Sequence, residues 1–170
     1  KKIIENIDIG GPAMVRAAAK NYNDVTVITN INQYKSLSSE LNFNKGRTTI
    51  NFREKMSELA FTETAHYDAL ISNYFNSKLK NLFPEKKIIT GNLIEKLRYG
   101  ENPHQQAAIY SLNNKLNIKQ LNGKNLSYNN YKDIFSAILI SKSLPKNTGT
   151  VIVKHSNPCG VSTNNDNILS

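Results

Sequence analysis

Apolar residues in the first half of the chain recur at a helical spacing. Five of them mark one helix face at three- and four-residue intervals: Tyr67, Leu70, Ile71, Tyr74 and Phe75. This spacing predicts a helix over about residues 62–78. Two further helices are expected over residues 33–40 and 51–60, the second with Asn51 as its N-cap.

Near the N-terminus the pattern predicts a loop, a helix and a strand in succession. Gly10 and Gly11 permit a tight turn, and Pro12 suits the first position of a helix. The alanine-rich run that follows favours a helix up to Lys20. The β-branched run Val25–Thr29 then reads as a strand, which gives a unit of α/β type.

Beyond residue 83 the pattern changes to short apolar runs separated by turn residues. Strands are predicted over residues 107–110 and 151–153, with a helix over 131–142 between them. Turns are expected at Asn113-Asn114, at Asn122-Gly123-Lys124, and after the last strand at Asn157-Pro158 and Gly160. The fold class is therefore α/β, in two parts over residues 1–83 and 84–170.

Composition narrows the function classes. The 170 residues carry a net charge of +9, for which there are three explanations. A proteome that is generally basic and rich in asparagine is favoured, binding of an anionic small substrate comes second, and binding of nucleic acid comes last. Lysines occur singly or in pairs, without the basic and aromatic interleaving of a nucleic-acid site. No apolar run is long enough to span a bilayer, and no signal peptide is visible. The single cysteine excludes an internal disulfide and suits the cytoplasm.

The first candidate site is Lys154-His155, directly after the predicted strand over residues 151–153. Ligands of α/β proteins gather at the carboxyl ends of strands, where a histidine can act as a general base beside a lysine that stabilises developing negative charge. For a bare dipeptide, a solvated lysine and a hydrogen-bonded histidine are the more common explanation. Cys159 is interpreted as a small residue filling the same turn.

Two more constellations stand out. The first consists of Asp8, Gly10, Gly11 and Lys20. The two glycines let backbone N–H groups approach an anion, and Asp8 and Lys20 are side chains able to take or give a proton. A capped helix with an exposed lysine in its last turn explains the same residues equally well. Arg98, Tyr99 and His104 could hold a phosphate and a ring, although a structured surface loop is the better interpretation of that stretch alone. His66 receives no role, and the histidines and the cysteine lack the spacing of zinc ligands, so no metal is expected.

Four blocks together resemble the bifunctional purine biosynthesis family, which joins AICAR (5-aminoimidazole-4-carboxamide ribonucleotide) formyltransferase to IMP cyclohydrolase. The blocks are ENIDIGGPAMVRAAAKN at 5–21, LRYGENPHQ at 97–105, LNGKNLSYNN at 121–130 and VKHSNPCG at 153–160, in the family's order. The resemblance implies the end of a methylglyoxal-synthase-like parallel-sheet cyclohydrolase domain over residues 1–83. The start of a cytidine-deaminase-like formyltransferase domain would follow over residues 84–170.

The resemblance also implies roles for individual residues. Asp8 and Lys20, with Gly10 and Gly11 beside them, match cyclohydrolase positions that act on formyl-AICAR. Arg98, Tyr99 and Asn129 match positions that hold the AICAR nucleotide. Lys154 and His155 match the pair that transfers the formyl group of 10-formyltetrahydrofolate, the cosubstrate. Together these reactions are the last two steps of de novo purine biosynthesis, carried out in the family by a homodimer.

By this resemblance the chain is the middle of a longer protein. Little or no activity in either reaction, and poor solubility, are therefore expected of the 170 residues alone. Two alternatives from other classes stay open: a basic nucleic-acid-binding module, and a non-catalytic remnant that keeps only the fold.

Overall fold

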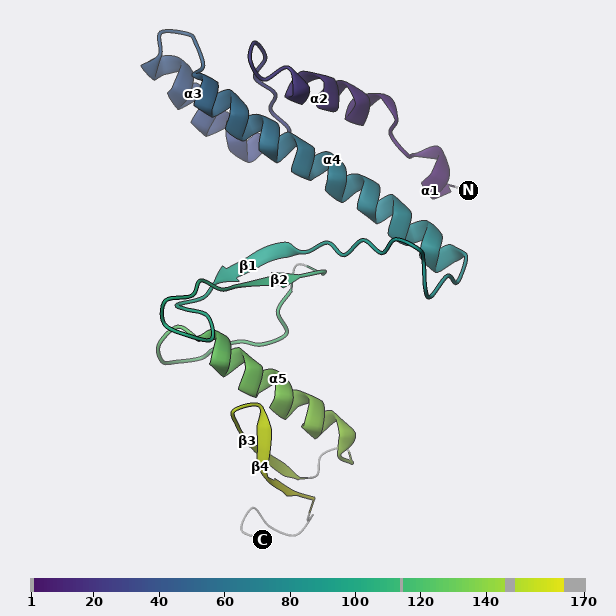
Figure 1. Cartoon of the computed structure of the whole chain (residues 1–170), viewed down its shortest axis with the longest axis vertical. Helices are drawn as coiled ribbons and strands as arrows, with labels where there is room; N and C mark the ends of the chain where they lie inside the picture. The colour runs from purple at the N-terminus through teal and green to yellow at the C-terminus, as the bar shows by residue number, and fades with distance from the viewer. Residues whose placement is uncertain (1, 114, 146–148, 164–170) are drawn as a thin grey trace. The chain divides into compact units, whose positions relative to one another are not determined.

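The computed structural model describes residues 2–113, 115–145 and 149–163. Residue contacts divide the chain into two compact units, Lys1–Thr90 and Gly91–Ser170. The described part of the first unit is helical, and the second combines one helix with four strands, so the predicted α/β class is confirmed at the level of a mixed α/β chain (Figure 1).

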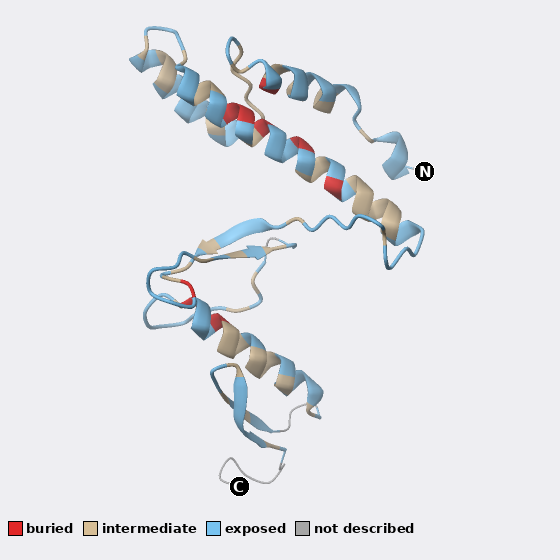
Figure 2. Cartoon of the chain, in the orientation of Figure 1, coloured by how far each residue is buried: buried red, intermediate tan, exposed pale blue. Residues whose placement is uncertain are grey.

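The first unit is a set of helices joined by loops. In chain order they are α1 (Lys2–Glu5), α2 (Gly10–Lys20), the 3₁₀ helix η1 (Ile31–Gln33), α3 (Tyr34–Phe43) and α4 (Ile50–Lys78). Helix α2 packs along α4, and the buried residues of this unit lie on these two helices (Figure 2). Ala19 of α2 and Met56 and Ala60 of α4 are buried there, and the small alanine side chains let the two helices approach closely. The buried Ser57 hydroxyl donates a hydrogen bond to the Ala19 carbonyl at 2.7 Å.

The two helices predicted over residues 51–60 and 62–78 are one continuous helix, α4. The stretch contains neither glycine nor proline, so nothing in it interrupts the backbone hydrogen bonds. The predicted N-cap at Asn51 is wrong: Thr49 caps the helix, and its hydroxyl accepts a hydrogen bond from the Phe52 amide at 3.3 Å.

The strand predicted over Val25–Thr29 is not formed, since this half-buried segment has no regular secondary structure. A strand needs a neighbour to supply hydrogen bonds, and none of the described strands pairs with it. Side chains position the segment instead: the Thr26 and Thr48 hydroxyls lie 2.8 Å apart. Both sheets found in the described residues are antiparallel, so the expected parallel sheet is not observed there.

Arg53 joins three loop carbonyls to α4. Its guanidinium donates to the carbonyl oxygens of Tyr22 at 2.8 Å, Asn23 at 2.7 Å and Thr48 at 2.6 Å. The planar fork of arginine reaches all three at once, whereas a lysine ammonium offers one point of contact. We expect Arg53→Lys to lower the free energy of unfolding by about 1–3 kcal/mol, measured by urea denaturation.

Lys55→Arg is the control for this substitution, because Lys55 is an exposed residue of the same helix. An unchanged urea midpoint in Arg53→Lys would show that the fork adds nothing to stability.

The second unit contains β1 (Asn92–Lys96), β2 (Ala108–Ser111), α5 (Tyr128–Ser143), β3 (Thr150–Lys154) and β4 (Asn157–Ser162). Strands β1 and β2 pair antiparallel, as do β3 and β4. Helix α5 connects the two sheets: the buried Tyr131 donates its hydroxyl to Glu95 of β1 at 2.8 Å, while the rest of the helix packs on β3 and β4. Burial, and next the Glu95 carboxylate, raise the pKa of Tyr131.

The predicted strands over residues 107–110 and 151–153 and the helix over 131–142 are confirmed. Helix α5 begins earlier than predicted because of a capping box. The Ser127 hydroxyl accepts from the Asn130 amide at 3.4 Å, and the Asn130 side-chain oxygen accepts from the Ser127 amide at 3.0 Å. The turn predicted at Asn113-Asn114 lies partly outside the described residues. No helix of the described ranges is long and apolar enough to cross a membrane.

Candidate functional site

The tight turn of the last hairpin consists of His155 and Ser156. Lys154 pairs with Asn157 in the β3–β4 ladder, so only these two residues form the loop. Their φ angles are +52° and +63°, the left-handed pattern of a type I′ turn. Such turns favour Asn-Gly, and residues other than glycine pay a conformational cost of about 1–3 kcal/mol each in this region. Strained backbone of this kind clusters at functional sites.

The turn predicted at Asn157-Pro158 and Gly160 is therefore wrong, because these residues form β4. Ile152 pairs with Gly160 and Val153 with Pro158, which leaves Cys159 as the extra residue of a β-bulge. A bulge and an edge strand both tolerate proline, which explains Pro158 within a strand. Cys159 is exposed on this strand and does not fill a turn.

The His155–Ser156 turn lies against α5. The Ser156 amide donates to the Asp133 carboxylate at 2.7 Å, and the Asn157 side-chain amide donates to the His155 carbonyl at 2.9 Å. A cavity of about 280 Å³ opens beside the turn, lined by Glu101, Asn129, Lys132, Asp133, His155 and Ser156. The expected base and one expected nucleotide contact thus share one cavity. Lys154 is the exposed last residue of β3 and is not among the residues that line this cavity.

The loop before β2 is fastened to the start of α5. The Asn129 side-chain amide donates to the Glu101 carbonyl at 3.1 Å, and the Lys132 ammonium lies 3.6 Å from the Glu101 carboxylate. Gly100 is buried in this loop, and its amide donates to the Gln105 carbonyl at 2.8 Å. A Cβ at Gly100 would lie 2.8 Å from the Cβ of Gln105, so this close approach requires glycine.

Arg98 and Tyr99 form a contact pair at the entry to this loop. The guanidinium carbon lies 4.7 Å from the Tyr99 ring centroid, and Nη2 donates to the phenol oxygen at 2.9 Å. The Arg98 hydrogen bond, and next that of Ser127, lower the pKa of Tyr99. The Tyr99 carbonyl also accepts from the Tyr128 amide at 3.4 Å, which connects the pair to the first turn of α5. His104 is exposed in the same loop.

A second polar group lies at the start of α2. The Asp8 carboxylate accepts from the Gly11 amide at 2.9 Å, and the Asp8 amide donates to the Tyr67 hydroxyl of α4 at 2.8 Å. The N-cap of α2 is Ile9, and Asp8, one position earlier, accepts a hydrogen bond from an amide of the first helical turn that has no partner within the helix. A Cβ at Gly11 would lie 2.2 Å from an Asp8 carboxylate oxygen, whereas a Cβ at Gly10 would meet nothing within 4 Å. The prediction that Pro12 is the first residue of the helix is wrong, because Pro12 is the third residue of α2.

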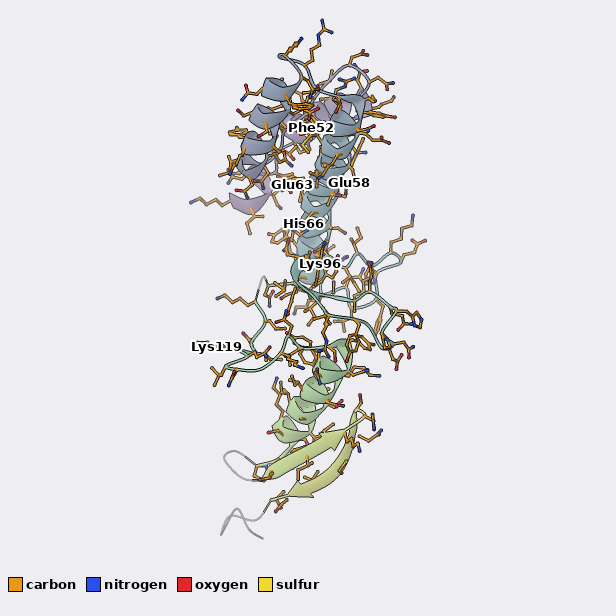
Figure 3. The ribbon with its side chains drawn as sticks, turned by 90° about the vertical axis from the view of Figure 1, so that its left-hand side faces the viewer. Phe52, Glu58, Glu63, His66, Lys96 and Lys119 are labelled. Atoms are coloured by element: carbon orange, nitrogen blue, oxygen red, sulfur yellow. The ribbon has the colours of Figure 1, made fainter. Side chains whose placement is uncertain are left out.

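Lys20 is not brought next to Asp8. It is the last residue of α2, and the rise of the helix over this length is about 15 Å. Lys20 is exposed there, where a cation suits the helix dipole. His66 lies on α4 (Figure 3).

Three residues missed in the sequence complete these sites: Asp133, Glu101 and Tyr67. The sequence predicts Tyr67 only as part of an apolar helix face, and Glu101 lies within the motif block at 97–105. The site role of each of the three comes from a contact distant in the chain, such as that of Asp133 with Ser156. The described residues contain no group of three or more His, Cys, Asp or Glu side chains able to hold a metal ion.

The protein is therefore a mixed α/β chain of two units. Each unit has a polar site at the start of a helix, α2 in the first unit and α5 in the second. The model of the AICARFT/IMPCHase bienzyme family matches residues 18–169. The chain belongs to this family.

Three curated relatives share the name bifunctional purine biosynthesis protein PurH. The protein of Bradyrhizobium diazoefficiens is 50% identical over 169 residues, which is 96% of this chain and 32% of the relative. That of Rhizobium leguminosarum bv. trifolii is 46% identical, over 94% of this chain and 31% of the relative. That of Oceanobacillus iheyensis is 46% identical, over 94% and 32%. The chain thus spans about a third of the length of these relatives.

Proposed function

We propose that this chain is the central part of an enzyme that transfers a formyl group from 10-formyltetrahydrofolate to AICAR and closes formyl-AICAR to IMP with loss of water. Family membership supports the pair of reactions, because the relatives are named bifunctional purine biosynthesis proteins. The observation that carries the formyl transfer is the convergence of Arg98–Tyr99, Asn129 and His155 on the first two turns of α5.

In this proposal, residues 84–170 begin the formyltransferase domain. Arg98 offers paired N–H donors to the nucleotide phosphate, and Tyr99 offers a ring face and a polarised hydroxyl. The AICAR amine is a weak nucleophile because its lone pair is delocalised. His155 takes the proton of this amine as it attacks the formyl carbon, and Lys154 stabilises the negative charge that develops on the formyl oxygen. The bond from the formyl carbon to N10 of the folate then breaks, and tetrahydrofolate leaves as N10 takes up a proton.

Residues 1–83 end the cyclohydrolase domain in the same proposal. Asp8, fixed by the Gly11 amide and next to the Tyr67 hydroxyl, handles a proton during ring closure, and Gly10 and Gly11 let the substrate approach the backbone. Lys20, at the other end of α2, is proposed as a second proton-handling residue of the same cyclisation. The domain folds implied by the resemblance, methylglyoxal-synthase-like and cytidine-deaminase-like, a homodimer and a cytoplasmic location belong to the proposal as well. No metal takes part in it.

Exposed apolar side chains fit a chain that packs against further parts of a longer protein. Phe83 is 92% exposed, Phe43 87% and Leu121 86%, and none of the larger described side chains is fully buried. We therefore propose that the 170 residues alone turn over neither substrate.

Loss of AICAR binding on replacing Arg98 tests the proposal. In the full-length protein, meaning a chain of the relatives' length that contains these residues, Arg98→Ala is expected to weaken AICAR binding about 10–100-fold by calorimetry, because a charge-assisted contact is worth about 1.5–3 kcal/mol. The same substitution should raise the pKa of Tyr99, seen in the ring resonance of labelled tyrosine, because its main lowering contact is lost.

Lys119→Ala is the matched control, since Lys119 carries an exposed charge on a loop of the same unit (Figure 3). Equal weakening by both substitutions would mean non-specific attraction to the basic chain. Steeply salt-dependent affinity for nucleic acid, with no AICAR binding, would favour the nucleic-acid module instead.

A further inference from the structure

We propose that Asp133 is a positioning residue for His155, which it directs by holding the left-handed turn of the β3–β4 hairpin. The inference rests on the proposed function for its catalytic meaning. Its structural part rests only on the contacts between α5 and this turn.

The turn needs an external support. Both of its residues have positive φ, and neither is glycine. Histidine enters the left-handed region more readily than most residues, but serine gains nothing there from its side chain. The two-residue loop therefore carries a conformational cost, and a sequence without further contacts would relax toward a looser loop.

Asp133 supplies this support from a rigid element. Its carboxylate oxygen accepts the Ser156 amide at 2.7 Å, a short charge-assisted hydrogen bond. In the turn this amide points away from the hairpin ladder and toward α5. Asp133 lies in the second turn of α5, one helical turn after Asn129, so one helix face presents both the nucleotide contact and the support of the base.

This arrangement fixes where the imidazole can go. His155, Asp133 and Asn129 line one cavity, and the backbone at His155 sets the direction of its side chain. If the Ser156 amide were released, the turn could relax and the imidazole would leave its place by an ångström or more. A misplacement of about 1 Å can lower a rate about 10²-fold.

The test compares kcat for formyl transfer in three variants of the full-length protein. Asp133→Ala is expected to lower kcat about 10²-fold with little change in KM for AICAR, because the nucleotide contacts stay in place. Asp133→Asn keeps an oxygen that can accept the Ser156 amide and is expected to stay within about 10-fold of the parent. Asp133→Ala combined with Ser156→Gly should recover about 10-fold of the lost kcat, because glycine adopts positive φ without penalty.

Rescue by glycine separates positioning from simple loss of folding. If Asp133→Ala keeps the parent kcat, or if Ser156→Gly recovers nothing in the Asp133→Ala protein, the inference is overturned. A KM increase equal to the kcat loss in Asp133→Asn would also overturn it, since that pattern indicates a direct substrate contact.

A structural measurement distinguishes this inference from the proposed function. Positive φ brings the amide and α protons of a residue close together, which gives a strong intraresidue cross-peak in NMR spectra of labelled protein. We expect strong cross-peaks at His155 and Ser156 in the parent and in Asp133→Asn, and weak ones in Asp133→Ala. If these results hold but the parent protein transfers no formyl group, the turn support stands and the proposed function fails. Unchanged cross-peaks in Asp133→Ala would refute the support itself.

Discussion

Replacing His155 with asparagine is expected to lower formyl transfer by the full-length protein about 10²–10⁴-fold, the usual contribution of a positioned general base. Asparagine cannot accept the proton of the AICAR amine, yet it suits the first position of a type I′ turn better than histidine does. The His155–Ser156 turn should therefore be preserved, and the urea midpoint should stay equal or rise. The measurement is the single-turnover rate of formyl transfer with both substrates saturating.

His66→Asn provides the control, because His66 lies on α4, receives no role in either site and does not line the His155 cavity. It is expected to keep the parent rate. A His155→Asn protein that folds and keeps its rate within about threefold of the parent would remove His155 from the chemistry, since a lost base costs far more.

The second large effect is expected at Gly11. A Cβ at this position would lie 2.2 Å from an Asp8 carboxylate oxygen, so Gly11→Ala must displace that carboxylate. The backbone itself accepts alanine, because Gly11 has no positive φ and alanine favours helices. Cyclisation of formyl-AICAR should therefore fall about 10²-fold, the cost of misplacing a catalytic group by about 1 Å.

Gly10→Ala is the comparison variant: a Cβ at Gly10 would meet nothing within 4 Å and leaves the Asp8 carboxylate in place, so this variant reports only on the approach of the substrate to the backbone. Cyclisation is followed by the absorbance change as IMP forms, and formyl transfer should be unaffected in both variants. Equal cyclisation rates for Gly11→Ala and Gly10→Ala would show that the position of the Asp8 carboxylate is unimportant for the reaction.

Local signals predicted the helices well because their hydrogen bonds lie within the element. The apolar spacing around Tyr67 and the alanine-rich run to Lys20 both correspond to helices, α4 and α2. Errors occurred at boundaries, where Thr49 and Ser127 act as caps through their side chains. The strand predicted over Val25–Thr29 failed for a different reason, because strand pairing depends on a partner that a local window cannot supply.

The sequence by itself determined the residue types of both sites, the helices that position them, and four motif blocks specific enough to indicate the family. Only the tertiary structure decided that His155 and Ser156 form the turn, because their left-handed backbone is not their intrinsic preference. The tertiary structure also decided that the Asp133 carboxylate accepts a hydrogen bond from this turn and that Lys20 lies at the opposite end of α2 from Asp8. The physical reason is range: helix propensity acts over a few residues, whereas the Asp133–Ser156 hydrogen bond joins positions 23 residues apart.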